Sequence, residues 1–213
     1  MAVHFKDSSV VIHKLKCGPY DNNAYLVVCP ETRESIVIDA PADPGSLIEA
    51  ARTTTVKAVV ITHSHSDHIL GLAEVRSALG APVGIGEPDA GALDASPDFL
   101  LRDGEEVRAG TVGLRAVSTP GHTPGSTCLA FGDHLFTGDT LFPGGPGKTG
   151  TPDRLRQVVH SITSRLFTLG DRVAFYPGHG DDSDLRTARD EYRVFSSRDH
   201  EPGLCGDVLW LES

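Results

Sequence analysis

The sequence predicts an α/β fold, because short apolar strands alternate along the chain with segments of helical periodicity. The run at residues 57–62 is short and rich in β-branched residues, which is typical of a buried strand. The next segment, 68–80, has apolar residues close to a helical period, which is typical of an amphipathic helix. Glycine and proline punctuate the boundaries between such segments, as expected between the elements of a globular domain.

The first half of the chain contains three expected strands and two expected helices. Two apolar runs come first, and a segment of helical spacing follows the second of them. The second helix is expected to end at Gly80, because glycine readily adopts the left-handed conformation found beyond helix ends. In chain order, the expected elements are strand 23–29, strand 34–40, helix 44–54, strand 57–62 and helix 68–80.

The second half repeats this order more loosely. Thr151 is suited to cap the longest expected helix, Pro152 to its first turn and Gly170 to its end. The closing residues 209–213 carry a tryptophan between two leucines, so the C-terminal tail is expected to pack on the domain. In chain order, the expected elements are two strand-like segments interrupted by glycine and proline, 111–121 and 126–139, followed by helix 151–170, strand 172–180 and helix 184–198.

Length and composition favour one soluble globular domain, taken as residues 1–213. Hydrophobic residues make up 39% and charged residues 23% of the chain. No stretch approaches the roughly 18 uninterrupted apolar residues of a membrane span, and the first residues lack the apolar core of a secretory signal. We therefore expect a cytoplasmic protein that does not interact with membranes.

Charge and cysteine content exclude two further classes. The net charge of −10 argues against an extended nucleic-acid surface, which would need clustered lysine and arginine. The cysteines lie far apart without a Cys-x-x-Cys pair, so reduced thiols are expected rather than a disulfide framework or a thiolate zinc site. They are Cys17, Cys29, Cys128 and Cys205. The oligomeric state is left open.

Three histidines and an aspartate are crowded into the stretch THSHSDH, directly after the expected strand 57–62. His63 and His65 are separated by one residue, so in an extended segment both side chains point to the same side. Asp67 and His68 follow where the chain turns into the helix, and could face the same point from another direction. Imidazole nitrogens and a carboxylate oxygen suit zinc, iron or manganese. The cluster therefore predicts a metal site, with a solvated polar turn as the alternative.

Candidate partners for this cluster lie at three further strand ends. His122 in GHTPG, Asp139 in TGD and His179 in PGHG each follow a strand-like run, beside glycine. Taken singly, each is more often structural than functional, but four such sites at strand ends favour one shared site. The remaining histidines lack this context and are assigned no role: His4, His13, His134, His160 and His200.

The ordered motifs THSHSDH, GHTPGS, GDTLF and PGHG resemble those of the metallo-β-lactamase fold superfamily, over about residues 22–195. The resemblance implies a four-layer αββα sandwich with metals at one rim of its two packed sheets. By motif position, Asp139 would bridge two metals, whose other ligands would be His63, His65 and His122 for one and Asp67, His68 and His179 for the other.

Such a site implies two divalent cations, with zinc as the first choice and iron or manganese as alternatives. A water shared by two cations has its pKa lowered from about 15.7 toward 7, so that hydroxide becomes the nucleophile at neutral pH. One metal would also polarise a carbonyl oxygen of the substrate. No protein nucleophile is then required, and Asp67 would have the additional catalytic role of orienting the hydroxide.

Within the superfamily, Asp139 as a bridge fits glyoxalase II-like hydrolases, lactonases and persulfide dioxygenases. A true β-lactamase would have cysteine or serine there and a secretion signal, and nuclease branches usually carry extra domains or an RNA-binding arm. The segment GDTLFPGGPGKTG resembles the glyoxalase II segment whose lysine contacts the peptide part of a glutathione thioester, so Lys148 is expected to bind substrate. The departures are Gly150, where glyoxalase II has tyrosine, and the 34 residues after His179, which we expect to be too few for its C-terminal helical domain.

We expect a small-molecule acyl substrate as the partner, but several functions stay open. The leading one is thioester hydrolysis, since a thiolate leaves readily because its conjugate acid has a pKa of about 8.5. The second is lactone or ester hydrolysis on the same site. The third is iron-dependent persulfide dioxygenation at one metal, although GKTGT replaces the expected GRTDF-like segment. A binding protein without catalysis is a fourth class, but it would not require so complete a ligand set.

Overall fold

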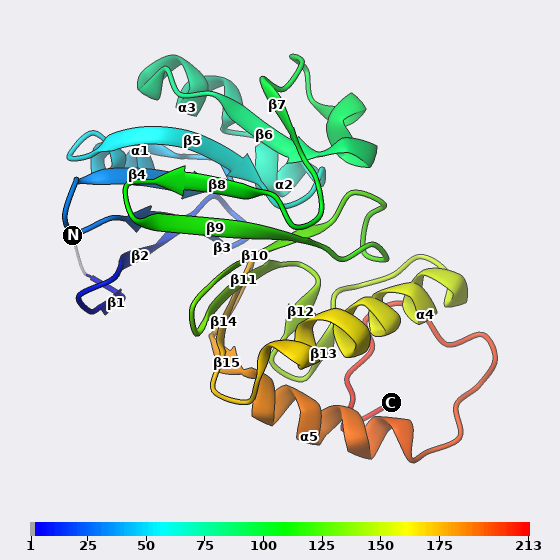
Figure 1. Cartoon of the computed structure of the whole chain (residues 1–213). Helices are drawn as coiled ribbons and strands as arrows, with labels where there is room; N and C mark the ends of the chain where they lie inside the picture. Colours follow the sequence, from blue (N-terminus) through cyan, green and yellow to red (C-terminus); the bar gives the residue numbers. More distant parts are fainter. Residues whose placement is uncertain (1–2) are drawn as a thin grey trace.

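A computed structural model describes residues 3–213, and its strands form two large sheets that lie face to face (Figure 1). Helices of the first half of the chain cover one outer face, and helices of the second half cover the other. The four-layer αββα arrangement expected from the sequence is therefore confirmed.

The first sheet has seven strands that lie side by side in chain order. The first four strands pair antiparallel, whereas the fourth to seventh pair in parallel. The strands are β1 (Phe5–Lys6), β2 (Val11–Cys17), β3 (Asn22–Val28), β4 (Glu34–Ile38), β5 (Thr55–Ile61), β6 (Val83–Gly86) and β7 (Phe99–Leu101).

The second sheet has six strands in the order β15-β14-β11-β10-β9-β8. These are β8 (Glu106–Ala109), β9 (Val112–Ser118), β10 (Thr127–Phe131), β11 (His134–Gly138), β14 (Ala174–Pro177) and β15 (Ser183–Asp184). β11 and β14 pair in parallel, and the other neighbours pair antiparallel. A small hairpin, β12 (Leu141–Phe142) and β13 (Gly145–Pro146), follows β11.

The alternation of side chains along β3 explains why its sheet is covered on both faces. Tyr25 and Val27 belong to the core between the sheets, whereas Leu26 and Val28 pack toward the outer helices. Every residue of β3 is buried, as expected for a strand covered from both sides. The second sheet contributes large apolar side chains to the same inner core, among them Leu114, Leu129 and Phe136.

Helices form the two outer layers, which lie at opposite ends of the molecule in Figure 1. The first sheet is covered by α1 (Gly45–Ala51), α2 (Ser66–Ile69) and α3 (Leu72–Leu79). A 3-10 helix, Glu87–Ala92, follows β6. The second sheet is covered by α4 (Pro152–Ser161), a π-helical turn (Ile162–Leu166), a 3-10 turn (Phe167–Leu169) and α5 (Leu185–Ser196).

The prediction of a single helix at 68–80 is wrong in one respect, because the helix is divided at Gly71 into α2 and α3. A Cβ on Gly71 would lie 2.1 Å from the carbonyl oxygen of Pro41, so the close approach of this loop requires glycine. The expected end is confirmed, since Gly80 follows α3 in the left-handed conformation with a φ of 61°.

The expected features of the second half are largely confirmed. The side chain of Thr151 caps α4, and the helical segment ends at Gly170, although its last turns are π and 3-10 rather than α. The tail packs on the domain through the fully buried Trp210, while its neighbours Leu209 and Leu211 are exposed. The cysteines are free thiols, as expected. Among residues 3–213, no helix has both the length and the apolar character needed to cross a membrane.

The two sheets are joined by hydrogen bonds at the edge where β5, β9, β11 and β14 end. The backbone N–H of Asn23 donates to the carbonyl of Gly178 at 2.7 Å, and that of Thr127 donates to the carbonyl of Thr62 at 2.9 Å. These bonds hold together the loops that follow the four strands, which carry the predicted metal ligands.

Candidate metal centre

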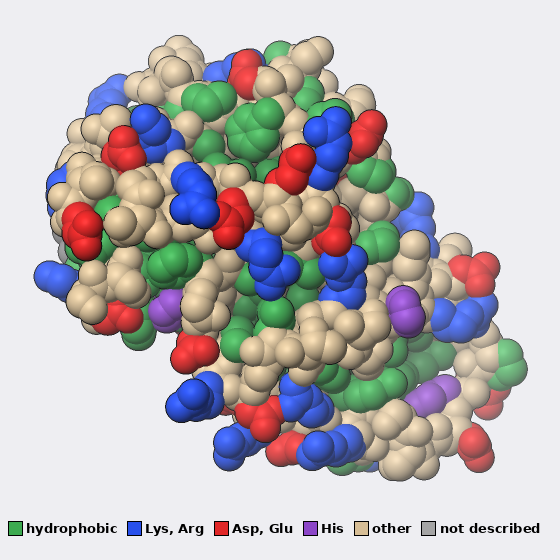
Figure 2. Space-filling view, in the orientation of Figure 1, with side chains coloured by type: hydrophobic (Ala, Val, Ile, Leu, Met, Phe, Trp, Pro, Cys, Tyr) green, Lys and Arg blue, Asp and Glu red, His purple; other side chains and the backbone are tan. Residues whose placement is uncertain are grey.

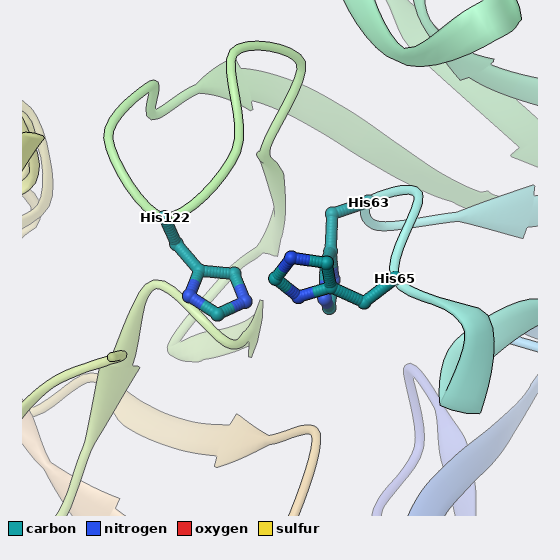
Figure 3. A group of neighbouring side chains, drawn as sticks. All are labelled: His63, His65 and His122. Carbon is teal, nitrogen blue, oxygen red and sulfur yellow. The ribbon is translucent and has the colours of Figure 1, made fainter. Parts of the chain in front are cut away.

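Three histidine side chains from two loops converge at this edge (Figure 3). His63 and His65 lie between β5 and α2, and His122 lies between β9 and β10. Their ring centroids are 4.9 Å apart for His63 and His65, 4.8 Å for His63 and His122, and 4.4 Å for His65 and His122. One nitrogen from each ring lies within 4.8 Å of one from each of the others, a spacing that a single ion can fill.

A second group lies beside the first and consists of Asp67 and His68 from α2 and His179 from the turn after β14. Their potential ligand atoms also lie within 4.8 Å of one another. The Oδ2 atom of Asp67 is 3.1 Å from Nε2 of His179 and 3.6 Å from Nε2 of His68.

Asp139 lies between the two groups. Its Oδ1 atom is 3.3 Å from Nε2 of His68, and its Oδ2 atom is 3.7 Å from Nε2 of both His122 and His179. A carboxylate beside histidines of both groups is placed to bridge two cations. The structure therefore brings all seven predicted ligand residues together.

Four buried polar atoms at this centre have no hydrogen-bond partner within residues 3–213. They are Nε2 of His63, His68 and His122 and Oδ1 of Asp139. A buried polar atom without a partner costs about 1–3 kcal/mol, so four that converge on one place indicate positions suited to cations. Imidazole nitrogens and carboxylate oxygens are ligands that zinc, iron and manganese accept. The residues present therefore fit metal ions.

A buried carboxylate outside the ligand set orients two of the rings. Nδ1 of His68 donates to Oδ2 of Asp39 at 2.8 Å, and Asp39 also accepts from the backbone N–H and the hydroxyl of Thr62, at 2.7 and 2.9 Å. Because that hydroxyl donates to Asp39, its oxygen is free to accept from Nδ1 of His63 at 3.1 Å. With Nδ1 as the donor, the neutral form of each ring directs the lone pair of its Nε2 toward the metal position.

Backbone carbonyls hold two further rings in the same way. Nδ1 of His122 donates to the carbonyl of Lys148 at 2.8 Å, and Nδ1 of His179 donates to the carbonyl of Tyr20 at 3.0 Å. Loops that are distant in the sequence therefore set the directions of the ligand nitrogens.

Asp89 ties the loop of His63 to the loop of His122. Its carboxylate accepts from the backbone N–H of Ser64 at 3.0 Å, and from the Thr123 hydroxyl and the Gly125 N–H at 2.7 Å each. Only 4% of Asp89 is exposed, so these bonds are shielded from water.

Sequence reasoning missed three polar residues that hold the ligands, namely Asp39, Asp89 and Asn22. Asn22 donates from Nδ2 to Oδ2 of Asp67 at 2.9 Å. Asp39 had a signal in the sequence, as a carboxylate that ends an apolar strand. Asp89 and Asn22 lie in segments whose local pattern points to no partner.

The two ligand carboxylates are anionic in the metal-free centre. Hydrogen bonds from His179 and Asn22 hold the pKa of Asp67 far below its usual range. Burial raises the pKa of Asp139, but the adjacent His68 outweighs burial and holds this pKa well below its usual range. Carboxylates in this form are ready to bind cations.

The histidines differ from one another in their preferred charge. Burial lowers the pKa of His63 and of His122, which favours the neutral rings that metals bind. Burial also lowers the pKa of His68, but Asp39 and Asp139 outweigh it and raise this pKa well above its usual value. A metal that binds His68 must therefore displace a proton.

Lys148 places its backbone, rather than its ammonium group, at the centre. Its carbonyl holds His122, whereas its Nζ atom lies 3.4 Å from Oδ2 of Asp207 and its side chain is 70% exposed. Gly150, where the sequence departs from glyoxalase II, faces open space. Substrate binding by Lys148 stays a prediction.

A pocket of about 540 Å³ opens at the second ligand group. Its volume is sufficient for a small molecule to lie beside Asp67 and His179. Its lining consists of Tyr20, Ser66, Asp67, Phe142 and His179.

The family model of the metallo-beta-lactamase superfamily matches residues 17–179. This match covers most of the chain and contains the whole ligand set, so the chain belongs to the metallo-beta-lactamase superfamily.

Its similarities extend to several activities within that family. The chain is 36% identical over 177 residues to a hydroxyacylglutathione hydrolase of Polaromonas sp. (strain JS666), which covers 80% of this chain and 66% of that protein. It is 34% identical over 163 residues to the mitochondrial persulfide dioxygenase ETHE1 of Homo sapiens, which covers 73% of this chain and 62% of that protein. This chain thus spans just under two thirds of the length of these relatives.

Among solved structures, the BLEG-1 B3 metallo-beta-lactamase superposes with a TM-score of 0.76 at 26% sequence identity. The superposition covers 84% of this chain and 96% of the other chain. The arrangement of the sheets and helices is therefore shared over nearly the whole of that protein.

Proposed function

We propose that the protein is a dinuclear metal-dependent hydrolase that acts on a thioester or a related acyl substrate. The observation that carries this proposal is the pair of ligand groups joined by Asp139. The similarity to a hydroxyacylglutathione hydrolase supports a thioester as the substrate.

The chemistry of the donor atoms suits two divalent cations, zinc as first choice and iron or manganese as alternatives. When bound, such a pair lowers the pKa of a water toward about 7 and polarises the substrate carbonyl. Asp139 would contact both cations, and the other ligands would be His63, His65 and His122 for one and Asp67, His68 and His179 for the other.

Asp67 has the additional catalytic role in this proposal. It lines the pocket, and its anionic carboxylate can accept a hydrogen bond from the attacking water and so orient it. Asn22 restricts the rotation of this carboxylate by donating to its Oδ2 atom. The thiolate of the substrate leaves without a general acid, because the pKa of its conjugate acid is about 8.5.

The remaining expectations are part of the same proposal. We expect residues 1–213 to act as one cytoplasmic unit on a small molecule, without a nucleic-acid or membrane partner. Basic and acidic side chains are interspersed on the face drawn in Figure 2, which agrees with a net charge of −10 in offering no large basic surface there. Lys148 would bind an anionic group of the substrate that is remote from the scissile bond.

Persulfide dioxygenation is a second candidate, because the chain is 34% identical to a human persulfide dioxygenase over 163 residues. This reaction uses iron and one metal site, whereas the chain has both ligand groups. Lactone or ester hydrolysis is the alternative on the dinuclear site.

Metal content and a substrate panel test the proposal. Protein purified without chelator should contain close to two metal equivalents and should hydrolyse thioesters faster than lactones, without consuming oxygen in the presence of persulfides. Asp139→Ala should lose metal and most of the turnover. A content of one metal equivalent under metal-replete conditions, together with persulfide-dependent oxygen uptake, would contradict the hydrolase proposal. It would favour persulfide dioxygenation instead.

A further inference from the structure

The pocket at the second ligand group lies beside the site of the proposed reaction. Asp67 and His179 belong both to its lining and to that ligand group. A carbonyl carbon held beside these residues carries two substituents, the acyl group and the leaving group. The pocket adjoins two of the ligands, so one of these substituents can extend into it.

Aromatic side chains form two walls of this pocket. The centroid of the Phe142 ring is 6.3 Å from that of His179. The Tyr20 side chain is 63% exposed, while its carbonyl is held by Nδ1 of His179 at 3.0 Å. The backbone of Tyr20 is thus anchored to a ligand, and its ring remains available for contact with a bound molecule.

No lysine or arginine of the described residues lines the same pocket. Lys148 is outside the lining, and its ammonium group lies 3.4 Å from Asp207. A negatively charged substituent inside the pocket would therefore lie beside two aromatic rings without a lysine or arginine as its counter-ion.

We propose that the pocket binds an uncharged apolar substituent, an alkyl chain or an aromatic ring, directly beside the scissile bond, with Tyr20 and Phe142 as specificity-determining residues. This inference rests on the proposed hydrolase function and names the substrate class. A charged group farther along the substrate remains compatible with it, because Lys148 lies outside this pocket.

Two series of thioesters with a neutral thiol test the proposal and distinguish the two sources of the apolar group. In one series, the acyl group lengthens from acetyl to hexanoyl on N-acetylcysteamine. In the other, an acetyl group is carried by thiols from ethanethiol to hexanethiol. We expect kcat/KM to rise about two- to fourfold per methylene in one series, which shows whether the pocket holds the acyl or the leaving group.

Variants connect this rise to the aromatic walls. Tyr20→Ala and Phe142→Ala should each lower kcat/KM about tenfold for the longest substrate and less than about twofold for the acetyl substrate. Tyr20→Phe should keep the preference for the longest substrate over the acetyl substrate. Val194→Ala removes exposed apolar surface on α5 and serves as the control, with no effect on either substrate. The kcat/KM for a butyryl thioester should also exceed that for a succinyl thioester at least about tenfold, if the acyl series is the one that rises.

Binding of hydroxamates to the metal-loaded protein provides a readout that needs no turnover. If the pocket holds the acyl group, as a rise in the acyl series would show, calorimetry should show hexanohydroxamate binding tighter than acetohydroxamate, and Tyr20→Ala should remove most of the difference. This result without any thioester hydrolysis would refute the proposed function and support the pocket assignment. A flat response in both thioester series would overturn the pocket assignment while leaving hydrolysis standing. If the acyl series is the one that rises, equal binding of both hydroxamates or a preference for the succinyl substrate would overturn it as well.

Discussion

Asp39 lies in the left-handed region of backbone conformation, with a φ of 62°, which is uncommon for residues other than glycine. This turn at the end of β4 directs its carboxylate toward Thr62 and His68, and only 1% of the residue is exposed. Its three hydrogen bonds reach the strand end that precedes His63 as well as the ring of His68. One buried carboxylate thus orients ligands of both groups.

Asp39→Asn should weaken metal binding about 10- to 100-fold, because an amide cannot accept all three hydrogen bonds and its NH₂ group would face a donor. The variant also lowers the proton affinity of His68, which by itself would favour metal binding. The loss of ring orientation is expected to dominate. Metal affinity measured by competition with a chromophoric chelator checks this. Asp153→Asn, at a carboxylate that is 88% exposed on α4, is the control, and equal affinities for the two variants would contradict the role of Asp39.

Lys148→Ala separates the role of the Lys148 carbonyl, which holds His122, from the proposed role of its ammonium group in substrate binding. The backbone carbonyl that holds His122 is retained, so metal content should stay unchanged. If the ammonium group binds an anionic part of the substrate, the loss of one such contact is worth about 1.5–3 kcal/mol and should appear mainly as a higher KM. Steady-state kinetics with an anionic thioester and a neutral one provide the test. An equal effect on both substrates would exclude a charge contact.

At the scale of elements, the turn between β14 and β15 shows how backbone packing determines the position of a ligand. Nδ2 of Asn23 donates to the carbonyls of Pro177 and Gly180, at 2.9 and 3.0 Å, on either side of His179. The first sheet thereby holds a turn of the second sheet. Between these two contacts, Gly178 packs against the carboxylate of Asp139.

Gly178→Ala should disrupt the centre without changing any ligand. Its Cβ atom would lie 2.2 Å from Oδ1 of Asp139, so either the carboxylate or the turn must move. We expect less than two metal equivalents and a fall in kcat of about 100-fold, since displacements of about 1 Å can have effects of this size. Gly203→Ala is the control, because no heavy atom lies within 4 Å of the added carbon. Full metal content in Gly178→Ala would show that the turn relaxes freely.

The C-terminal tail acts as another supporting element. Thr149 and Gly206 exchange backbone hydrogen bonds at 3.1 and 2.8 Å, and the N–H of Trp210 donates to the carbonyl of Gly144 at 2.7 Å. The buried Trp210 ring, 5.4 Å from the Tyr192 ring, anchors the tail on the outer helices. The loop whose carbonyl at Lys148 holds His122 is thereby connected to the outermost layer.

At the scale of the whole molecule, metal binding, proton binding and folding are coupled through His68. In the metal-free protein its pKa is raised well above its usual value, because Asp39 and Asp139 outweigh burial. A raised pKa contributes stability that is fully present below about pH 6.5 and is lost as the pH rises through the raised value. The metal-loaded protein requires the neutral ring and lacks this dependence.

The gain in Tm on metal binding should therefore be larger at pH 9 than at pH 6.5. The reason is that displacing the proton from His68 becomes easier as the pH approaches its raised pKa. Thermal unfolding with saturating metal and with excess chelator, at several pH values and constant ionic strength, measures the difference. A gain that is constant or falls with pH would contradict a protonated His68 in the metal-free state.

The sequence by itself determined the features that depend on neighbouring residues. Gly80 and Thr151 mark helix ends through interactions within a few residues, and the crowding of His63, His65, Asp67 and His68 after a strand is visible in one short stretch. Positions at strand ends indicated the partners of this cluster, and the family motifs added their division between two metals and the layered fold. Local periodicity did not foresee the break at Gly71, because the cause is the carbonyl of Pro41 in a loop that is distant along the chain.

Only the tertiary structure decided which groups hold the ligands and which side chains face a substrate. Asp39, Asp89 and Asn22 act across the centre on residues that are far away in the sequence. The ammonium group of Lys148 is turned toward Asp207, and Tyr20 meets Phe142 at the pocket, because folding brings separate loops to one edge of the sheets. The physical reason is that hydrogen bonds and packing between distant segments leave no periodic pattern along the chain.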